Sequence, residues 1–234
     1  MNQLLLIWQG MPSLLAGTLV TLNLTFYFLA IGFLLGIVLA FGRVYGPAYL
    51  RTFFIIPFER FFRAVPELVL LFLFYFGSFY FHINISAFLA AIVAMGLRSA
   101  AYQAQIFRGA IQSIGEDQMK AARSLGMSTI QAIRYVILPQ ALRLSIPSWA
   151  NEYAVVLKDS SLAYAVGVTE LLRQGRYIVA RTFGNALLVY TVCALIYFIL
   201  VFLGNQLLKF LEEKYKIPGY AIKESRGQSV LERI

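Results

Sequence analysis

The sequence predicts an all-α membrane protein with about five transmembrane helices. Its 234 residues are 60% hydrophobic and only 13% charged, with a mean hydropathy of +0.73. A soluble domain needs more polar residues than this to cover its core. No charged residue precedes Arg43, and a second uncharged run covers residues 183–208. Each run can cross a hydrocarbon layer, which takes about 20 apolar residues.

Five apolar segments are the candidate spans, separated by polar or charged residues. They cover residues 13–41, 53–81, 85–112, 130–157 and 183–208. Because five is an odd number, the two ends of the chain are expected on opposite sides of the membrane. The N-terminal segment lacks the positive region of a signal peptide and is too long for one, so we expect it to be retained.

The distribution of lysine and arginine predicts that the N-terminus is outside and the C-terminus inside the cell. This orientation places 12 basic residues on the inner side: Arg43, Arg51, Arg108, Lys120, Arg123, Arg134, Lys209, Lys214, Lys216, Lys223, Arg226 and Arg233. It places four on the outer side: Lys158, Arg173, Arg176 and Arg181. The net charge of +9 therefore reflects membrane topology and lipid contact, and we expect no nucleic-acid partner.

The chain is expected to form one membrane domain over residues 1–217, followed by a polar cytoplasmic tail over residues 218–234. Gly32 and Gly36 have the GxxxG spacing that lets two helix backbones approach closely, as in a helix dimer, although glycine is common in transmembrane helices without such a role. Cys193 and His82 are the only residues of their types, so the sequence predicts neither a disulfide within the chain nor a metal site.

An Ala-rich stretch of mixed charge lies between the third and fourth predicted spans, and its central part covers about residues 114–129. It reads GEDQMKAARSLGMSTIQAIRYVILPQALRLSIP. We expect short helices separated near Gly126, because glycine can adopt the left-handed conformation that ends a helix. A helix-turn-helix that projects from the bilayer suits insertion into a cleft on another protein. Taken alone, the stretch is equally compatible with an ordinary loop between two spans.

With these residues the chain resembles the integral membrane permeases of binding-protein-dependent ABC importers. Their loop signature has Glu-Ala-Ala, three residues and Gly, followed by an Ile-x-Leu-Pro-like ending. Matching positions hold Ala121, Ala122, Gly126 and Pro139, whereas Lys120 stands in place of the glutamate. Four further stretches resemble the polar amino-acid branch of histidine, arginine and glutamine permeases: GTLVTLNLTF, FRAVPELVLLFLFYFG, SAAYQAQIFRGAIQSI and NEYAVVLKDSSLAYAVGVTEL.

The resemblance implies a type I importer fold in a prokaryotic inner membrane. It implies a second permease subunit, identical or homologous, two cytoplasmic ATP-binding subunits and an external solute-binding protein. The segment that would couple to the ATPase consists of Lys120, Ala121, Ala122, Ser124, Leu125, Gly126 and Met127. No GxxxxGK[ST] pattern occurs in the sequence, so we expect ATP and Mg²⁺ on the partner ATPase and no cofactor on this chain.

Two other classes of function compete with this interpretation. A secondary transporter or channel that works without ATPases is disfavoured by the few carboxylates at membrane depth and by the Gly126 loop. An enzyme that acts within the membrane is disfavoured because the sequence contains neither an HExxH zinc pair nor a GxSxG elbow. We therefore expect a transport subunit that is not itself an enzyme.

Charged side chains at membrane depth predict the substrate site, because their burial is costly and those that occur there tend to face a cavity. An amino acid presents an ammonium and a carboxylate, which need groups of opposite charge. The resemblance places a substrate-facing carboxylate at Glu152, which we expect to bind the ammonium. Arg63 or Arg98 would bind the carboxylate. The remaining candidates, at the outer end of the fourth span, are Lys158, Asp159 and Ser160.

Each assignment has a structural alternative. Arg63 and Glu67 are four residues apart and would neutralise each other on a continuous helix. Lys158 and Asp159 would be interfacial residues, and Glu152 would belong to a buried ion pair. One face of the third span is polar through Arg98, Ser99, Tyr102, Gln103 and Gln105, and it should face the protein interior or a water path.

Two prolines interrupt the backbone hydrogen bonds of the fourth predicted span. Pro139 and Pro147 are candidate hinges for a motion that alternately opens the two sides of the membrane. The alternative is that both are kinks without a mechanical role.

Overall fold

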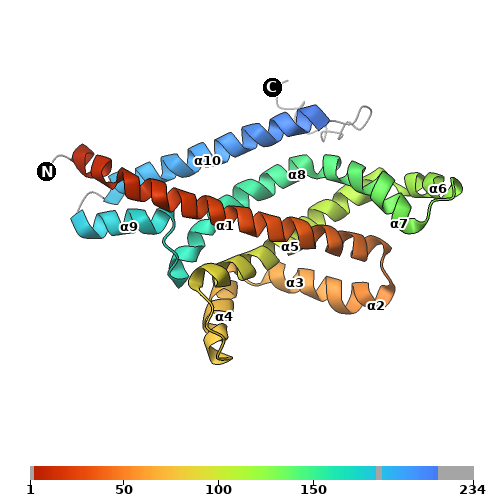
Figure 1. Cartoon of the computed structure of the whole chain (residues 1–234), viewed down its shortest axis with the longest axis horizontal. Coiled ribbons are helices and arrows are strands. Elements are labelled where there is room, and N and C mark those ends of the chain that lie inside the picture. The colour runs from red at the N-terminus through yellow and green to blue at the C-terminus, as the bar shows by residue number, and fades with distance from the viewer. Residues whose placement is uncertain (1–2, 183–185, 216–234) are drawn as a thin grey trace, which may run out of the picture.

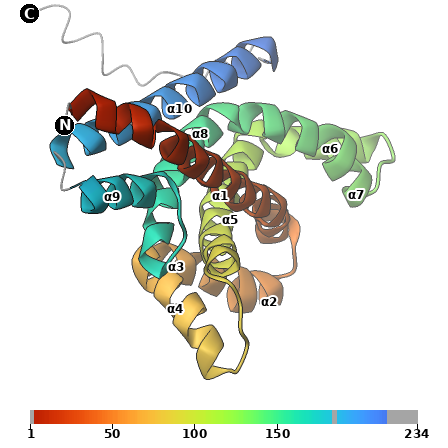
Figure 2. The ribbon, with the colours of Figure 1, turned by 60° about the vertical axis from the view of Figure 1, so that its left-hand side comes forward.

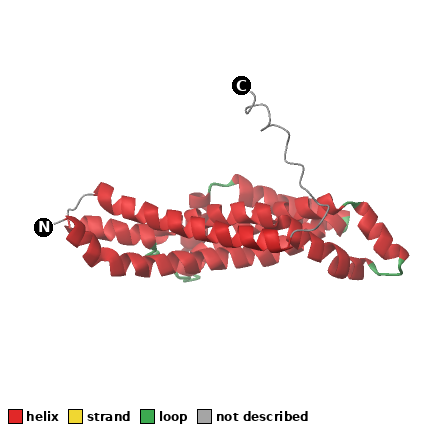
Figure 3. Cartoon of the chain, turned by 90° about the horizontal axis from the view of Figure 1, so that it is seen from above, coloured by secondary structure: helices red, strands yellow, loops and turns green. Residues whose placement is uncertain are grey.

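The computed structural model describes residues 3–182 and 186–215, and within them the regular elements are helices joined by loops (Figure 3). The prediction of an all-α protein is confirmed. The predicted polar tail, residues 218–234, lies outside the described residues. In chain order the elements are α1 (Gln3–Tyr45), α2 (Ala48–Leu50), η1 (Arg51–Ile55), α3 (Ile56–Ala64), α4 (Glu67–Tyr80), α5 (Ala87–Ile114), α6 (Glu116–Ser124), α7 (Thr129–Ala132), η2 (Ile133–Ile137), α8 (Leu138–Asp159), η3 (Ser160–Val166), α9 (Leu171–Thr182) and α10 (Ala186–Tyr215).

The long helices α1, α5, α8 and α10 give the molecule its length, as Figure 1 shows. The start of α1, helix α9 and the start of α10 lie at one end, which we call the outer end. Helices α6 and α7 lie at the other end, which we call the coupling end because it holds the segment that the sequence predicts to couple to an ATPase. Helix α10 runs toward the coupling end, so the start of α1 and the end of α10 point to opposite sides, as an odd number of spans predicts.

Three described helices are long and apolar enough to cross a membrane: Trp8–Tyr45 of α1, and the whole of α5 and α10. A fourth candidate is the pair Ala48–Ala64 and Glu67–Tyr80, which is bent by 106°. The charged helix α8 does not meet the same criterion, but it packs against both α5 and α10. The five predicted segments are therefore helical in their described parts, although only three or four of them qualify as spans by length and composition.

The bend corrects the prediction of a straight span over residues 53–81. Pro66 has no N–H to donate, and its ring disfavours the helical conformation of the preceding residue. Val65 is accordingly extended, with φ −79° and ψ 131°. Helix α4 restarts at Glu67 and leaves the bundle at a steep angle, which is clearest in Figure 2. This break places the carboxylate of Glu67 in a position that a continuous helix would not give it.

The two glycines of the GxxxG spacing pack α1 against α5 within the chain. A Cβ atom added to Gly36 would lie 3.1 Å from the backbone nitrogen of Ala104, and one added to Gly32 would contact the side chain of Gln103. The opposing surface of α5 also includes Ser99 and Ala104, whose small side chains let the helix axes approach. The close approach that this spacing allows is therefore made between two helices of the same chain.

We expect Gly36→Ala to lower the stability of the protein by about 1–3 kcal/mol, because the added methyl group overpacks a helix contact that cannot yield. Gly109→Ala on α5 is the matched control, since nothing lies within 4 Å of its added Cβ. Thermal unfolding in detergent measures both effects. Equal melting temperatures for the two variants would contradict the close packing of α1 and α5.

Candidate functional site

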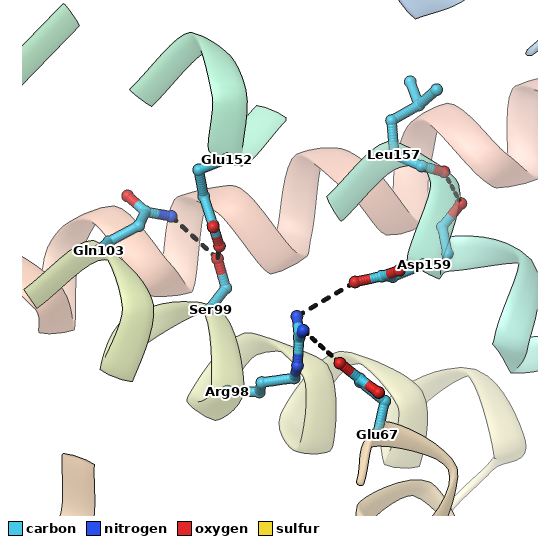
Figure 4. A network of polar contacts seen from close by, with 8 residues as sticks. Glu67, Arg98, Ser99, Gln103, Glu152, Leu157 and Asp159 are labelled. Atoms are coloured by element: carbon cyan, nitrogen blue, oxygen red, sulfur yellow. Dashed lines mark hydrogen bonds and ion pairs between the residues drawn. The ribbon is translucent and has the colours of Figure 1, made fainter. Parts of the chain in front are cut away.

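Arg98 of α5 forms the centre of a charged cluster between three elements (Figure 4). Its guanidinium pairs with Glu67 at the start of α4, and its Nη1 lies 3.1 Å from Oδ2 of Asp159 at the end of α8. The Arg98 side chain is only 7% exposed. Its guanidinium carbon also lies 4.7 Å from the ring centroid of Tyr102. The cluster therefore joins α4, α5 and the end of α8 through one buried cation.

The break before α4 explains the partner of Glu67. Because the helix is interrupted at Val65 and Pro66, Arg63 and Glu67 do not share one helical face, and the structure pairs Glu67 with Arg98 instead. Glu67 also occupies the first turn of α4, where the helix dipole favours a carboxylate. Arg63 is exposed, and its guanidinium lies 5.4 Å from the ring centroid of Tyr102.

Glu152 belongs to a buried chain of hydrogen bonds next to this cluster. Ser99 donates to Glu152 Oε1 at 3.0 Å, and Gln103 Nε2 donates to the Ser99 oxygen at 3.0 Å. Gln103 also donates to the carbonyl of Leu29 in α1 at 3.2 Å and accepts a bond from Trp149 at 2.7 Å. Ser99 and Gln103 are fully buried. The predicted polar face of α5 thus faces the protein interior at these positions.

Glu152 itself is 6% exposed, and within the described ranges no basic group lies at ion-pair distance from it. The alternative of a buried ion pair at this residue is therefore not what the structure shows. The charges of Arg98 and Asp159 act on it through space, without an ion pair. A buried carboxylate without a cationic partner is costly and is suited to receive a cation from outside the chain.

The other predicted site residues lie elsewhere. Lys158 is exposed and lines a separate apolar groove of about 600 Å³ between the end of α8 and α10, together with Tyr190 and Tyr197. Ser160 is buried and donates to the carbonyl of Leu157 at 2.7 Å. Of the six predicted residues, Arg98 and Asp159 are in direct contact. Glu152 lies next to them, bonded to Ser99, which follows Arg98 in the chain, and Arg63 lies on the other side of the Tyr102 ring. Lys158 and Ser160 do not join this set.

Sequence reasoning missed a second ionic cluster toward the coupling end. Glu59 of α3 is 1% exposed and pairs with Arg43 at the end of α1. Gln105 of α5 donates to the same carboxylate oxygen and accepts from Arg108. The signal in the sequence was the isolated Glu59 near an apolar run, since a buried carboxylate needs a partner. Which partner it takes depends on how α1, α3 and α5 pack.

We expect Glu59→Ala to destabilise the protein by about 1–3 kcal/mol, because it removes the counter-charge of the half-buried Arg43 and the acceptor of the Gln105 amide. Thermal unfolding of the purified protein measures the loss. The control is Glu213→Ala near the end of α10, where the side chain is exposed and the effect should be small. Unfolding of the Glu59 variant at the wild-type temperature would show that the cluster does not hold α3 in place.

The predicted helix-turn-helix forms at the coupling end. Helix α6 ends at Ser124, and Gly126 has a φ of +83°, which confirms the predicted left-handed turn. The backbone N–H of Gly126 donates to Arg123 at 3.0 Å, and that of Met127 donates to Ala122 at 3.2 Å. This pair of bonds is the Schellman ending of a helix. Ser128 then starts α7 through a capping box with Gln131.

Large apolar side chains are exposed on this turn. Leu125 is 81% exposed and Ile130 is 77% exposed, although both lie in a segment of mixed charge. Lys120, which replaces the glutamate of the family signature, has its Nζ 3.4 Å from Glu116 and 3.7 Å from Asp117. The Lys120 ammonium therefore forms its ion pairs with two carboxylates of its own helix, α6. Exposed leucine and isoleucine at the tip of a projecting turn are typical of a protein-binding surface.

At the outer end, Glu170 fixes the start of α9. Its carboxylate accepts bonds from the backbone N–H groups of Leu172 and Arg173, at 2.9 and 2.8 Å, and from the hydroxyl of Tyr197 at 2.9 Å. Burial raises the pKa of the Glu170 carboxyl, and the two backbone bonds oppose that shift. Arg176 and Arg181 remain exposed on α9. The helix thus presents basic residues at the outer end.

Comparison with known proteins places these features in a family. Residues 32–217 match the family of binding-protein-dependent transport system inner membrane components. The chain is 35% identical to the glutamine transport system permease protein of Escherichia coli (strain K12) over 213 residues, which are 90% of this chain and 96% of that protein. It is 37% identical to a probable amino-acid ABC transporter permease protein of Bacillus subtilis (strain 168), with 88% and 91% of the two chains covered.

Solved structures agree with this relationship. A crystal structure of an amino acid ABC transporter with histidines matches with a TM-score of 0.80 and 35% identity, over 89% of this chain and 96% of that one. A methionine ABC transporter in an inward-facing conformation shares the fold, with a TM-score of 0.71 and 21% identity over 90% and 98% of the two chains. The chain therefore belongs to the family of inner membrane components of binding-protein-dependent transport systems.

Proposed function

We propose that this chain is the transmembrane subunit of an ATP-driven amino-acid importer and forms the translocation path in a prokaryotic inner membrane. The observation that carries the proposal is the buried charged network around Arg98 and Glu152, which combines both signs of charge at membrane depth. The names of relatives at 35% and 37% identity, which refer to glutamine and amino-acid permeases, support the substrate class.

The energy for import comes from partner subunits. The turn between α6 and α7 inserts into a cytoplasmic ATP-binding subunit, with Leu125 and Ile130 as its apolar contacts. ATP and Mg²⁺ bind to that partner, and this chain serves as a transport subunit without catalytic activity of its own. A second permease subunit completes the path. An external solute-binding protein delivers the amino acid, and the exposed arginines of α9 favour an acidic surface on it.

Within the path, Glu152 binds the ammonium group of the substrate. It is buried and receives a single neutral hydrogen bond from Ser99, so an ammonium at this position supplies the missing counter-charge. Arg98 is already paired with Glu67 and Asp159. Arg63 is exposed beside Tyr102 and is therefore the better group for the substrate carboxylate.

Opening and closing of the path moves α8 relative to α4 and α5. The pair between Arg98 and Asp159 connects α5 to the end of α8, and Glu67 connects the same cation to α4. Pro139 follows the wide π-helical turn η2, and Pro147 lies inside α8. Both prolines act as hinges in this proposal, because a missing backbone hydrogen bond lowers the cost of bending.

The test is substrate-stimulated ATP hydrolysis. The permease is purified with its ATP-binding subunit, reconstituted in liposomes, and screened with amino acids in the presence of the solute-binding protein. At least one amino acid should raise the rate of hydrolysis, and Glu152→Gln should reduce that stimulation while the ATPase stays bound. Stimulation that Glu152→Gln leaves unchanged would remove this residue from the site.

A further inference from the structure

A groove runs along the outer half of α10, between the end of α8 and helix α9. Its main part has a volume of about 600 Å³ and is lined mostly by apolar side chains, from Tyr190 to Phe198 and Val201. A second cavity of about 470 Å³ lies at its outer mouth, where Arg176 is one of the lining residues. The two cavities share Leu172 and Tyr190, so they are two parts of one groove.

The packing of α10 explains why this groove is open. Toward the coupling end, the hydroxyl of Tyr153 in α8 donates to the carbonyl of Leu200 at 2.9 Å, and α8 is held against α10. Toward the outer end, α9 packs on α10 instead, since a Cβ atom added to Gly175 would lie 2.7 Å from Sγ of Cys193. Between these two contacts α10 forms the floor of the groove, and α9 and the end of α8 form its walls.

The length of the groove matches one leaflet of a membrane. From Tyr190 to Val201 it follows α10 for about 16 Å, at the helical rise of about 1.5 Å per residue. The hydrocarbon core of a bilayer is about 30 Å thick, so one leaflet contributes about half of that. Tyr164 and Tyr190 at the outer mouth have the amphipathic rings that are typical of the interface between membrane and water. The groove can therefore take an acyl chain along its whole length.

Two cations line this groove, and neither has an ion-pair partner in the described part of the chain. Arg176 and Lys158 are both exposed. Lys158 also acts through space on Asp159, but that carboxylate already has an ion-pair partner in α5. Glu170, the acid behind the groove wall, is fully buried and accepts three hydrogen bonds of its own. Both cations are thus available to an anion in the groove.

We propose that the groove between α8, α9 and α10 binds an anionic phospholipid such as phosphatidylglycerol. The headgroup lies at Arg176 and Lys158, because guanidinium and ammonium groups bind phosphate through charge-assisted hydrogen bonds. One acyl chain follows α10 from Tyr190 to Val201. A zwitterionic phospholipid brings a cation of its own to the two cations of the groove, so it binds less well. The site does not depend on which solute the permease carries.

Arg176 and Arg181 have different surroundings on α9. They are five residues apart, which corresponds to about 140° around a helix, and Arg181 does not line the groove. Arg181 therefore stays available to the solute-binding protein and provides a matched control for the lipid site.

Photo-crosslinking in proteoliposomes tests this inference. The permease, purified with its ATP-binding subunit, carries a photoreactive benzoylphenylalanine in place of Phe198, which lines the groove. The bilayer contains equal amounts of phosphatidylglycerol and phosphatidylcholine. Mass spectrometry should find phosphatidylglycerol adducts in excess by at least about fivefold, the effect of one cation near an anionic headgroup. The same probe in place of Ile199, an exposed neighbour outside the groove, should give nearly equal amounts.

Variants assign the preference to the two cations. Arg176→Gln combined with Lys158→Gln should lower the excess at position 198 to the ratio found at position 199, whereas Arg181→Gln should leave it unchanged. Retention of the ATP-binding subunit shows that each variant is folded. The same lipid ratio at both probe positions in the unmodified background would overturn the inference. Adducts between position 198 and the second permease subunit would also overturn it, and would identify the groove as an interface between two copies of the chain.

Discussion

Gly126→Val is expected to abolish ATP-dependent transport while the protein still folds into the membrane. The φ of +83° at Gly126 is accessible to glycine but strained for a β-branched residue. The variant must therefore rebuild the turn that ends α6 and presents Leu125 and Ile130. Uptake into proteoliposomes should fall at least about tenfold, the effect of a misplacement that costs about 1.4 kcal/mol or more at the coupling surface.

Gly126→Asn is the matched control for this prediction. Asparagine tolerates the left-handed conformation, and nothing lies within 4 Å of a Cβ atom added to Gly126. The rate of amino-acid uptake by the Gly126→Asn variant should stay close to that of the wild type. Equal uptake by the valine and asparagine variants, whether both normal or both lost, would mean that the backbone conformation of this turn does not control coupling.

Arg98→Met is expected to be among the most damaging single substitutions in the chain. It removes the buried cation of this cluster and leaves Glu67, Asp159 and Glu152 close together without it. The expected loss is about 3–5 kcal/mol of stability, as for other buried pairs that lose one partner. Thermal unfolding measures it, and the amount of protein that inserts into the membrane should fall as well.

A triple variant distinguishes loss of charge balance from loss of packing. Arg98→Met combined with Glu67→Gln and Asp159→Asn removes the cation and both paired carboxylates, so it should recover part of the stability lost in Arg98→Met. Transport should not recover, because the site no longer holds its charges. No recovery of stability would show that Arg98 acts through packing, including its contact with Tyr102, and not through its ion pairs.

Local features of the fold could be predicted because a few neighbouring residues determine them. The left-handed turn at Gly126 and the largely helical character of the described parts of the five apolar segments follow from glycine chemistry and hydropathy. The helix break at Val65 could also have been predicted, since Pro66 lies within the apolar run. It was missed because length and hydropathy alone favoured one continuous span.

The contacts of the site depend on tertiary packing and could be predicted only in part. The pairing of Glu67 with Arg98 joins residues 31 positions apart across the bend before α4. Lys158 and Asp159 were grouped because they are adjacent, but neighbours on a helix point about 100° apart, so one faces Arg98 and the other faces α10. Sequence spacing did not reveal that Glu59 meets Arg43 between α3 and α1.

Amino-acid uptake into proteoliposomes is the most direct test of the central claim. Liposomes carry the permease with its ATP-binding subunit, the solute-binding protein on the side of uptake and ATP on the opposite side. The proposed function predicts accumulation against a gradient that requires both ATP and the ATP-binding subunit and that is lost in Gly126→Val. Equal uptake by the permease alone, driven by a proton or sodium gradient without ATP, would contradict it and identify a secondary transporter.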